Sequence, residues 1–161
     1  MHKFPAITPS VCNLRPLSRG WVRIVSPDPA TYPEIKLNYL CAPEDRSVAV
    51  DAMRYTRRIM AARALARFQP EEFRPGNDAQ SDEELKRAAG ELGTTIFHPV
   101  GTCKMGGDPL AVVDDRLRVK GIDGLRVVDA SIMPRITSGN TQAPVYVIAE
   151  KGSAMIVEDN R

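Results

Sequence analysis

The chain has 161 residues, enough for one domain with its own core, and its 43% hydrophobic and 26% charged content is that of an ordinary globular protein. Because 22 basic residues oppose 20 acidic ones, the net charge of +2 argues against nucleic acid or an anionic membrane as the main partner. Three widely spaced cysteines and two histidines support neither a disulfide framework nor a zinc site, so we expect no metal.

The first 40 residues predict an extended connection followed by two strands. Residues 1–20 contain three prolines and are expected to be a non-helical connection. Residues 21–25 and 34–40 largely alternate apolar and polar side chains, which is typical of half-buried strands. A proline-rich loop separates them and could return the chain antiparallel.

Two helices are predicted next. Asp45 is placed to cap a helix over residues 45–68, which Pro70 would stop. Arginines recur along this helix; they could face an anionic partner, but we interpret them as a solvated surface. Ser81 stands at capping-box spacing from a glutamate and predicts a second helix through Leu92.

The remaining elements are short, apart from one helix near the end of the chain. Residues 94–97 read as a strand leading into His98. Residues 112–119 predict a small hairpin, and residues 125–128 a strand that ends at Asp129. From about Thr141 to residue 157 the apolar positions nearly encircle a helix, as in helices buried inside larger proteins.

Three segments in the second half of the chain carry a family likeness. They are residues 98–106 (HPVGTCKMG), 124–134 (GLRVVDASIMP) and 138–144 (SGNTQAP). Together they resemble the C-terminal signature of glucose-methanol-choline (GMC) oxidoreductases, enzymes that oxidise alcohols with FAD.

The resemblance implies an α+β fold in two parts. These are an antiparallel substrate-domain sheet with helices over residues 21–107, and the closing strand and helix of an FAD-binding α/β domain over residues 108–161. The chain has no Gly-x-Gly-x-x-Gly turn, the motif that seats a dinucleotide pyrophosphate. We therefore expect the C-terminal part of an enzyme whose FAD-binding N-terminal portion is missing. FAD is expected in the full-length parent and not on this fragment alone.

No apolar run approaches the roughly 20 residues needed to span a bilayer. The expected location is the cytoplasm or the periphery of the inner membrane. The expected substrate is a small primary alcohol, either choline or an aliphatic or aromatic alcohol. The alternative is a non-catalytic α+β binding or interaction module derived from the same fold.

The resemblance also assigns a catalytic pair. Removing hydride from an alcohol requires a base for the hydroxyl proton, and histidine titrates near neutral pH. His98 matches the family's catalytic histidine, and Asn140 matches the histidine or asparagine that steadies the substrate oxygen. Without the resemblance, His98 reads as a buried structural histidine and Asn140 as a helix cap.

Cofactor contacts follow from the same likeness. Thr141, Gln142 and Val145 would meet the pyrimidine edge of the flavin at the positive end of a helix dipole. Asp129 and Ala130 would lie beside the ribityl chain and pyrophosphate. On spacing alone, these residues could instead form an ordinary helix start and a turn.

Overall fold

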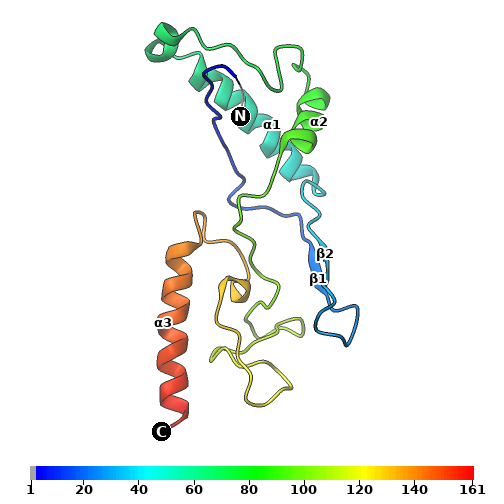
Figure 1. Cartoon of the computed structure of the whole chain (residues 1–161), viewed down its shortest axis with the longest axis vertical. Helices are drawn as coiled ribbons and strands as arrows, with labels where there is room; N and C mark the ends of the chain where they lie inside the picture. Colours follow the sequence, from blue (N-terminus) through cyan, green and yellow to red (C-terminus); the bar gives the residue numbers. More distant parts are fainter. Residues whose placement is uncertain (1–2) are drawn as a thin grey trace. The chain divides into compact units, whose positions relative to one another are not determined.

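The computed structural model describes residues 3–161, which form two compact units. One unit contains the chain up to Gly20 together with Leu37–Thr94, and the other contains Trp21–Lys36 and Thr95–Arg161. Both units contain helices, and the second also holds a two-stranded antiparallel sheet (Figure 1). The expected α+β class is confirmed.

Two helices pack along each other in the first unit. They are α1 (Pro43–Met60) and α2 (Asp82–Leu92) (Figure 1). Val50 on α1 and Leu85 and Ala88 on α2 are buried, whereas most other side chains of this pair are at least partly exposed. This helix pair is therefore the core of the first unit.

The start of α2 is the capping box that the sequence predicts. The Ser81 hydroxyl accepts a hydrogen bond from the Glu84 amide, and the Glu84 carboxylate accepts one from the Ser81 amide at 2.9 Å. Hydrogen bonds from the Ser81 amide and hydroxyl lower the pKa of Glu84 to about 2. The predicted end is also confirmed, since Gly93 is the C-cap.

The start of α1 differs from the prediction, because Ala42 and not Asp45 is its N-cap. The buried Asp45 carboxylate lies in the first turn and accepts hydrogen bonds from the amides of Leu17 (2.9 Å) and Ser18 (2.7 Å) and from the Asn13 side chain (3.0 Å). Burial acts to raise the pKa of Asp45, but hydrogen bonds from Ser18 and Leu17 outweigh it and lower that pKa. Asp45 thus ties the N-terminal segment to the helix.

The end of α1 also comes earlier than the sequence indicates. The helix stops at Met60, and a short 3₁₀ helix, η1 (Arg63–Phe68), follows. Beyond it, Glu72 returns to Arg57 and accepts two hydrogen bonds from the guanidinium, each of 2.8 Å. This contact joins residues 15 positions apart, so local helix propensity could not predict it.

The sheet of the second unit consists of β1 (Trp21–Arg23) and β2 (Glu34–Lys36). Val22 pairs with Ile35 in its middle, so the predicted antiparallel pairing is confirmed. Both strands are shorter than predicted. Asn38 and Leu40 have φ angles of 51° and 57°, outside the strand region, which is why β2 cannot extend to residue 40.

The core of the second unit is formed by the buried side chains of Val113, Leu117 and Ile132. The hairpin predicted over residues 112–119 has its turn near Asp114, where the Leu117 amide donates to the Asp114 carbonyl at 3.1 Å. The flanking segments pair through isolated bridges, such as Val113 with Val119, and form no extended hairpin strands. The predicted strand over residues 125–128 likewise reduces to a single bridge at residue 126.

The long helix α3 (Gln142–Asp159) packs against this core through Gly152, its buried residue. A Cβ at Gly152 would lie 2.6 Å from Cγ1 of Val128 and 3.3 Å from Cδ1 of Leu117. Only glycine permits this closeness, because no larger side chain fits between the helix and the core.

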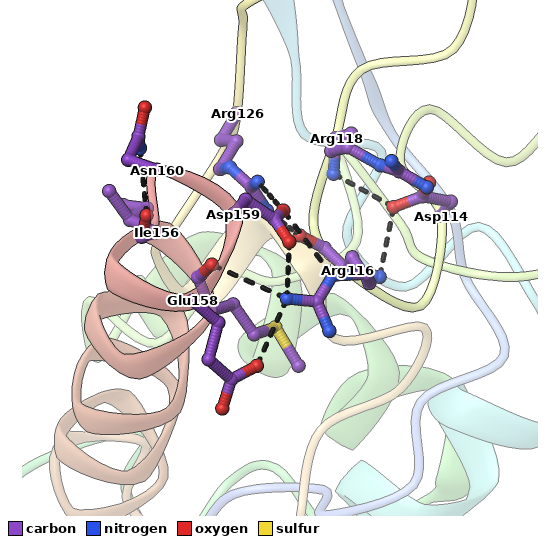
Figure 2. Close-up of polar contacts among 9 residues, drawn as sticks. Asp114, Arg116, Arg118, Arg126, Ile156, Glu158, Asp159 and Asn160 are labelled. Atoms are coloured by element: carbon purple, nitrogen blue, oxygen red, sulfur yellow. Dashed lines mark hydrogen bonds and ion pairs between the residues drawn. The ribbon is translucent and has the colours of Figure 1, made fainter.

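Ion pairs tie the C-terminal end of α3 to the core loops (Figure 2). The Arg116 guanidinium lies 2.7 Å from the Asp159 carboxylate and 3.1 Å from that of Glu158, and Arg126 also pairs with Asp159. The hydrogen bond that Arg116 donates to Asp159 raises the pKa of Arg116 and lowers the pKa of Asp159. Together with Gly152, these pairs fix the helix within the second unit.

Candidate functional site

His98 does not stand at the end of a strand, and that expectation is wrong. Residues 94–97 pair with no other segment in the described structure. The Thr95 hydroxyl instead accepts a hydrogen bond from the Phe97 amide at 3.1 Å, and Phe97 has a φ of 62°. His98 therefore follows an irregular, left-handed bend and is half-buried.

The segment that follows His98 is held against residues 131 and 132 by backbone hydrogen bonds. The Cys103 amide donates to the Ser131 carbonyl at 3.1 Å, and the Met105 amide donates to the Ile132 carbonyl at 2.8 Å. Two of the three segments that carry the family likeness are thereby joined. Sequence reasoning named both segments but not this pairing between them.

Gly101, which lies in one of the segments that carry the family likeness, occupies a position where the backbone requires glycine. Its φ of 89° lies in the left-handed region. A Cβ there would also lie 3.3 Å from the Met133 carbonyl oxygen. Any larger residue would strain the backbone just where it turns from His98 toward the core.

The structure brings His98 and Asn140 together. The Asn140 side-chain nitrogen lies 2.9 Å from His98 Nε2, although the two residues are 42 positions apart. The Thr141 hydroxyl lies 2.8 Å from the other ring nitrogen, Nδ1. Both ring nitrogens therefore have a partner from the start of α3, and sequence reasoning did not find the contact with the Thr141 hydroxyl.

The N-terminus of α3 carries the remaining predicted contacts. Thr141 is the N-cap, so the alternative in which Asn140 caps the helix is wrong. Gln142 is exposed at the first helical position. The Val145 amide donates to the Thr141 carbonyl at 3.0 Å, so this N–H is used within the helix.

Asp129 and Ala130 lie at the turn before the segment that pairs with Cys103. Asp129 is the N-cap of the 3₁₀ helix η2 (Ala130–Ile132), and its carboxylate accepts a hydrogen bond from the Ser131 amide at 2.7 Å. Its side chain is exposed. The capping role is therefore present, and a cofactor contact at this turn remains a prediction.

The chemistry of this site is that of a proton acceptor beside an amide donor at a helix N-terminus. An imidazole can take a proton, and a side-chain amide can donate to an oxygen that gains negative charge. Within residues 3–161, no group of three or more His, Cys, Asp or Glu side chains could hold a metal ion. Among the described residues, every helix falls short of the length and apolar content that a membrane span requires.

Comparison with known proteins gives a consistent result. A family model described as GMC oxidoreductase matches residues 16–149. The chain is 50% identical over 151 residues to the oxygen-dependent choline dehydrogenase of Burkholderia pseudomallei (strain 1710b), covering 94% of this chain and 26% of that protein. It thus spans about a quarter of the length of the curated relatives it matches.

Solved structures agree with this match. The crystal structure of pyridoxine 4-oxidase from Mesorbium loti has a TM-score of 0.80 and 40% identity, covering 88% of this chain and 28% of that one. An FAD-dependent oxidoreductase from Chaetomium thermophilum has a TM-score of 0.85 and 34% identity, covering 92% of this chain and 26% of that one.

Proposed function

This chain belongs to the GMC oxidoreductase family, and from that premise we propose that it is the C-terminal part of an FAD-dependent enzyme that oxidises a primary alcohol. Choline and aliphatic or aromatic alcohols are the candidate substrates. Residues 21–107 would belong to the substrate-binding domain and residues 108–161 to the FAD-binding domain.

The observation that carries the proposal is the 2.9 Å contact between His98 Nε2 and the Asn140 amide. When hydride leaves an alcohol carbon, the hydroxyl proton must also leave, or a costly positive charge stays on the product. His98 takes that proton at Nε2. Asn140 faces the same atom and can turn its N–H toward the alcohol oxygen as negative charge develops there.

The residues present also fit a flavin. Helix geometry leaves the amides of Gln142 and Ala143 without an intrahelical partner, and the helix dipole is positive at this end. Such donors suit the electron-rich edge of a reduced flavin. Bound FAD would supply the acceptor for the hydride. The residues proposed to hold it are Asp129, Ala130, Asn140, Thr141, Gln142 and Val145.

The rest of the enzyme would cover part of this chain. Tyr146 and Val147 on α3 are 68% and 69% exposed, which is unusual for apolar side chains on a helix of this kind. The chain is also about a quarter as long as its relatives. We therefore propose that the N-terminal FAD-binding portion packs on this helix.

The test is to purify the whole protein that carries this sequence and to measure bound flavin and alcohol oxidation. A panel of choline, benzyl alcohol, pyridoxine and short aliphatic alcohols would be assayed with oxygen and with a dye as electron acceptor. We expect flavin at one per chain and turnover of at least one alcohol. A folded protein without flavin and without turnover would contradict the proposal and favour the non-catalytic module.

A further inference from the structure

We infer that Thr141 is a positioning residue, whose hydroxyl holds the neutral His98 ring in the tautomer with its proton on Nδ1. The catalytic role of Thr141 rests on the proposed function, whereas the hydrogen bond between Thr141 and His98 does not depend on that function. The Thr141 hydroxyl lies 2.8 Å from Nδ1, a normal length for a strong hydrogen bond. Thr141 is only 5% exposed, so little water competes for that bond.

The tautomer follows from the two partners of the ring. A neutral imidazole has one N–H and one lone pair, and each must face the right partner. Asn140 presents its amide nitrogen, a donor, to Nε2 at 2.9 Å. Nε2 is then the acceptor and the proton sits on Nδ1, which donates a hydrogen bond to the Thr141 hydroxyl oxygen.

A second contact favours the opposite tautomer and is weaker. The Thr141 backbone amide lies 3.5 Å from Nδ1, and that bond requires a lone pair on Nδ1. At this distance it is at the outer limit of a hydrogen bond, whereas the 2.9 Å contact of the Asn140 amide with Nε2 is well within it. The Asn140 donor therefore places the lone pair on Nε2, and the Thr141 hydroxyl stabilises this tautomer by accepting from Nδ1.

The Thr141 side chain is free for this task because it does not cap its helix. A threonine at an N-cap normally has an extended backbone and accepts a hydrogen bond from an amide of the first turn. Thr141 has φ −88° and ψ −4° and makes no side-chain cap bond. Its hydroxyl is directed to His98 instead. Its carbonyl accepts from Val145, which fixes the residue to the start of α3.

The consequence for catalysis is that Nε2 is always the basic atom. If the proton moved to Nε2, that atom would donate and could not take a proton from an alcohol. When Nε2 is protonated, Nδ1 still donates to the Thr141 hydroxyl, so the same bond also serves the charged ring. The Thr141 hydroxyl thus holds the orientation of the ring and accepts from Nδ1 in both charge states, while Asn140 donates to the lone pair on Nε2.

The experiment compares Thr141→Val and Thr141→Ser with the native chain. Valine has the shape of threonine without the hydroxyl, and serine keeps the hydroxyl. Long-range ¹H–¹⁵N NMR of the imidazole distinguishes the two tautomers in the 161-residue chain. The chain has only two histidines, and His2→Gln assigns the His98 signal.

We expect the proton on Nδ1 in the native chain and in Thr141→Ser. Thr141→Val should raise the share of the other tautomer roughly 2- to 10-fold, the change produced by losing one neutral hydrogen bond. A native spectrum with the proton on Nε2 would overturn the inference, and it needs no variant to fold. An unchanged spectrum in a folded Thr141→Val chain would also overturn it.

The same variants in the whole protein connect the tautomer to turnover. Flavin reduction by alcohol, measured per bound flavin, should slow roughly 2- to 10-fold in Thr141→Val and recover in Thr141→Ser. These outcomes separate the two proposals. If His98→Ala leaves flavin reduction intact, the proposed function fails while the NMR result on Thr141 stands.

Discussion

Replacing Gly152 by alanine tests the close packing of α3 on the core. The new Cβ would lie 2.6 Å from Val128 Cγ1 and 3.3 Å from Leu117 Cδ1, so at least one side chain or the helix must move. Overpacking of this kind costs about 1 to 3 kcal/mol. Alanine gains up to about 1 kcal/mol over glycine in a helix, which leaves a net loss of about 1 kcal/mol.

Gly90→Ala is the matched control. Gly90 is an exposed residue of α2, and apart from its chain neighbours and the backbone of its own helix, no atom lies within 4 Å of the Cβ that alanine would add. Only the helix propensity acts there, so this variant should be stabilised by up to about 1 kcal/mol. Both substitutions replace glycine by alanine within a helix, yet they should change the free energy of unfolding in opposite directions.

The assay is urea denaturation followed by far-UV circular dichroism and by the fluorescence of Trp21, the single tryptophan. A Val128→Ala background removes the methyl groups that clash, so Gly152→Ala should cost less there than in the native chain. If Gly152→Ala stabilised the chain as much as Gly90→Ala does, the close approach of α3 to the core would be refuted.

Two further predictions concern the capping box and the flavin. The folded pKa of Glu84 is about 2, below its usual 4.5, so its stabilising effect is complete above about pH 4.5 and is lost as pH falls toward 2. Glu84→Gln keeps an acceptor for the Ser81 amide but does not titrate, so the urea midpoint of this variant should fall less than that of the native chain over this pH range. An equal fall in both chains would contradict the stabilising role of the ionised Glu84. The 161-residue chain alone should not retain FAD through gel filtration, because it lacks the Gly-x-Gly-x-x-Gly turn; stoichiometric flavin absorbance would show otherwise.

The structural features that were predicted correctly depend on residues that lie close together along the chain. The capping box at Ser81 involves residues three apart, and its side-chain chemistry is sufficient to specify it. The antiparallel pairing of β1 and β2 follows from alternation and a proline-rich loop. The start of α3 was also located, since the apolar positions placed it at about Thr141 and the helix begins at Gln142.

What the sequence did not predict depends on partners far along the chain. Asp45 looks like a cap, but its carboxylate binds the amides of Leu17 and Ser18, 28 and 27 residues away. Residues 94–97 have strand-forming side chains, yet a strand needs a partner, and the left-handed Phe97 ends the extended path.

The candidate site was predicted only in part, for the same reason. His98 and Asn140 were paired through the family resemblance, and in the structure the Asn140 side-chain nitrogen lies 2.9 Å from His98 Nε2. The contact between the Thr141 hydroxyl and His98 Nδ1 links residues 43 positions apart, and no local pattern reveals it. Thr141 was expected to meet the cofactor, whereas its side chain contacts the proposed base.

The most direct test of the proposed role of His98 is single-turnover reduction of the flavin by alcohol in the whole protein, with and without His98→Gln. The reaction would be followed without oxygen as the loss of flavin absorbance. We predict that the variant keeps its flavin and that reduction slows about 10²- to 10⁴-fold, the usual contribution of a positioned general base. Reduction at the native rate by a variant with full flavin content would contradict the assignment of His98 as the base.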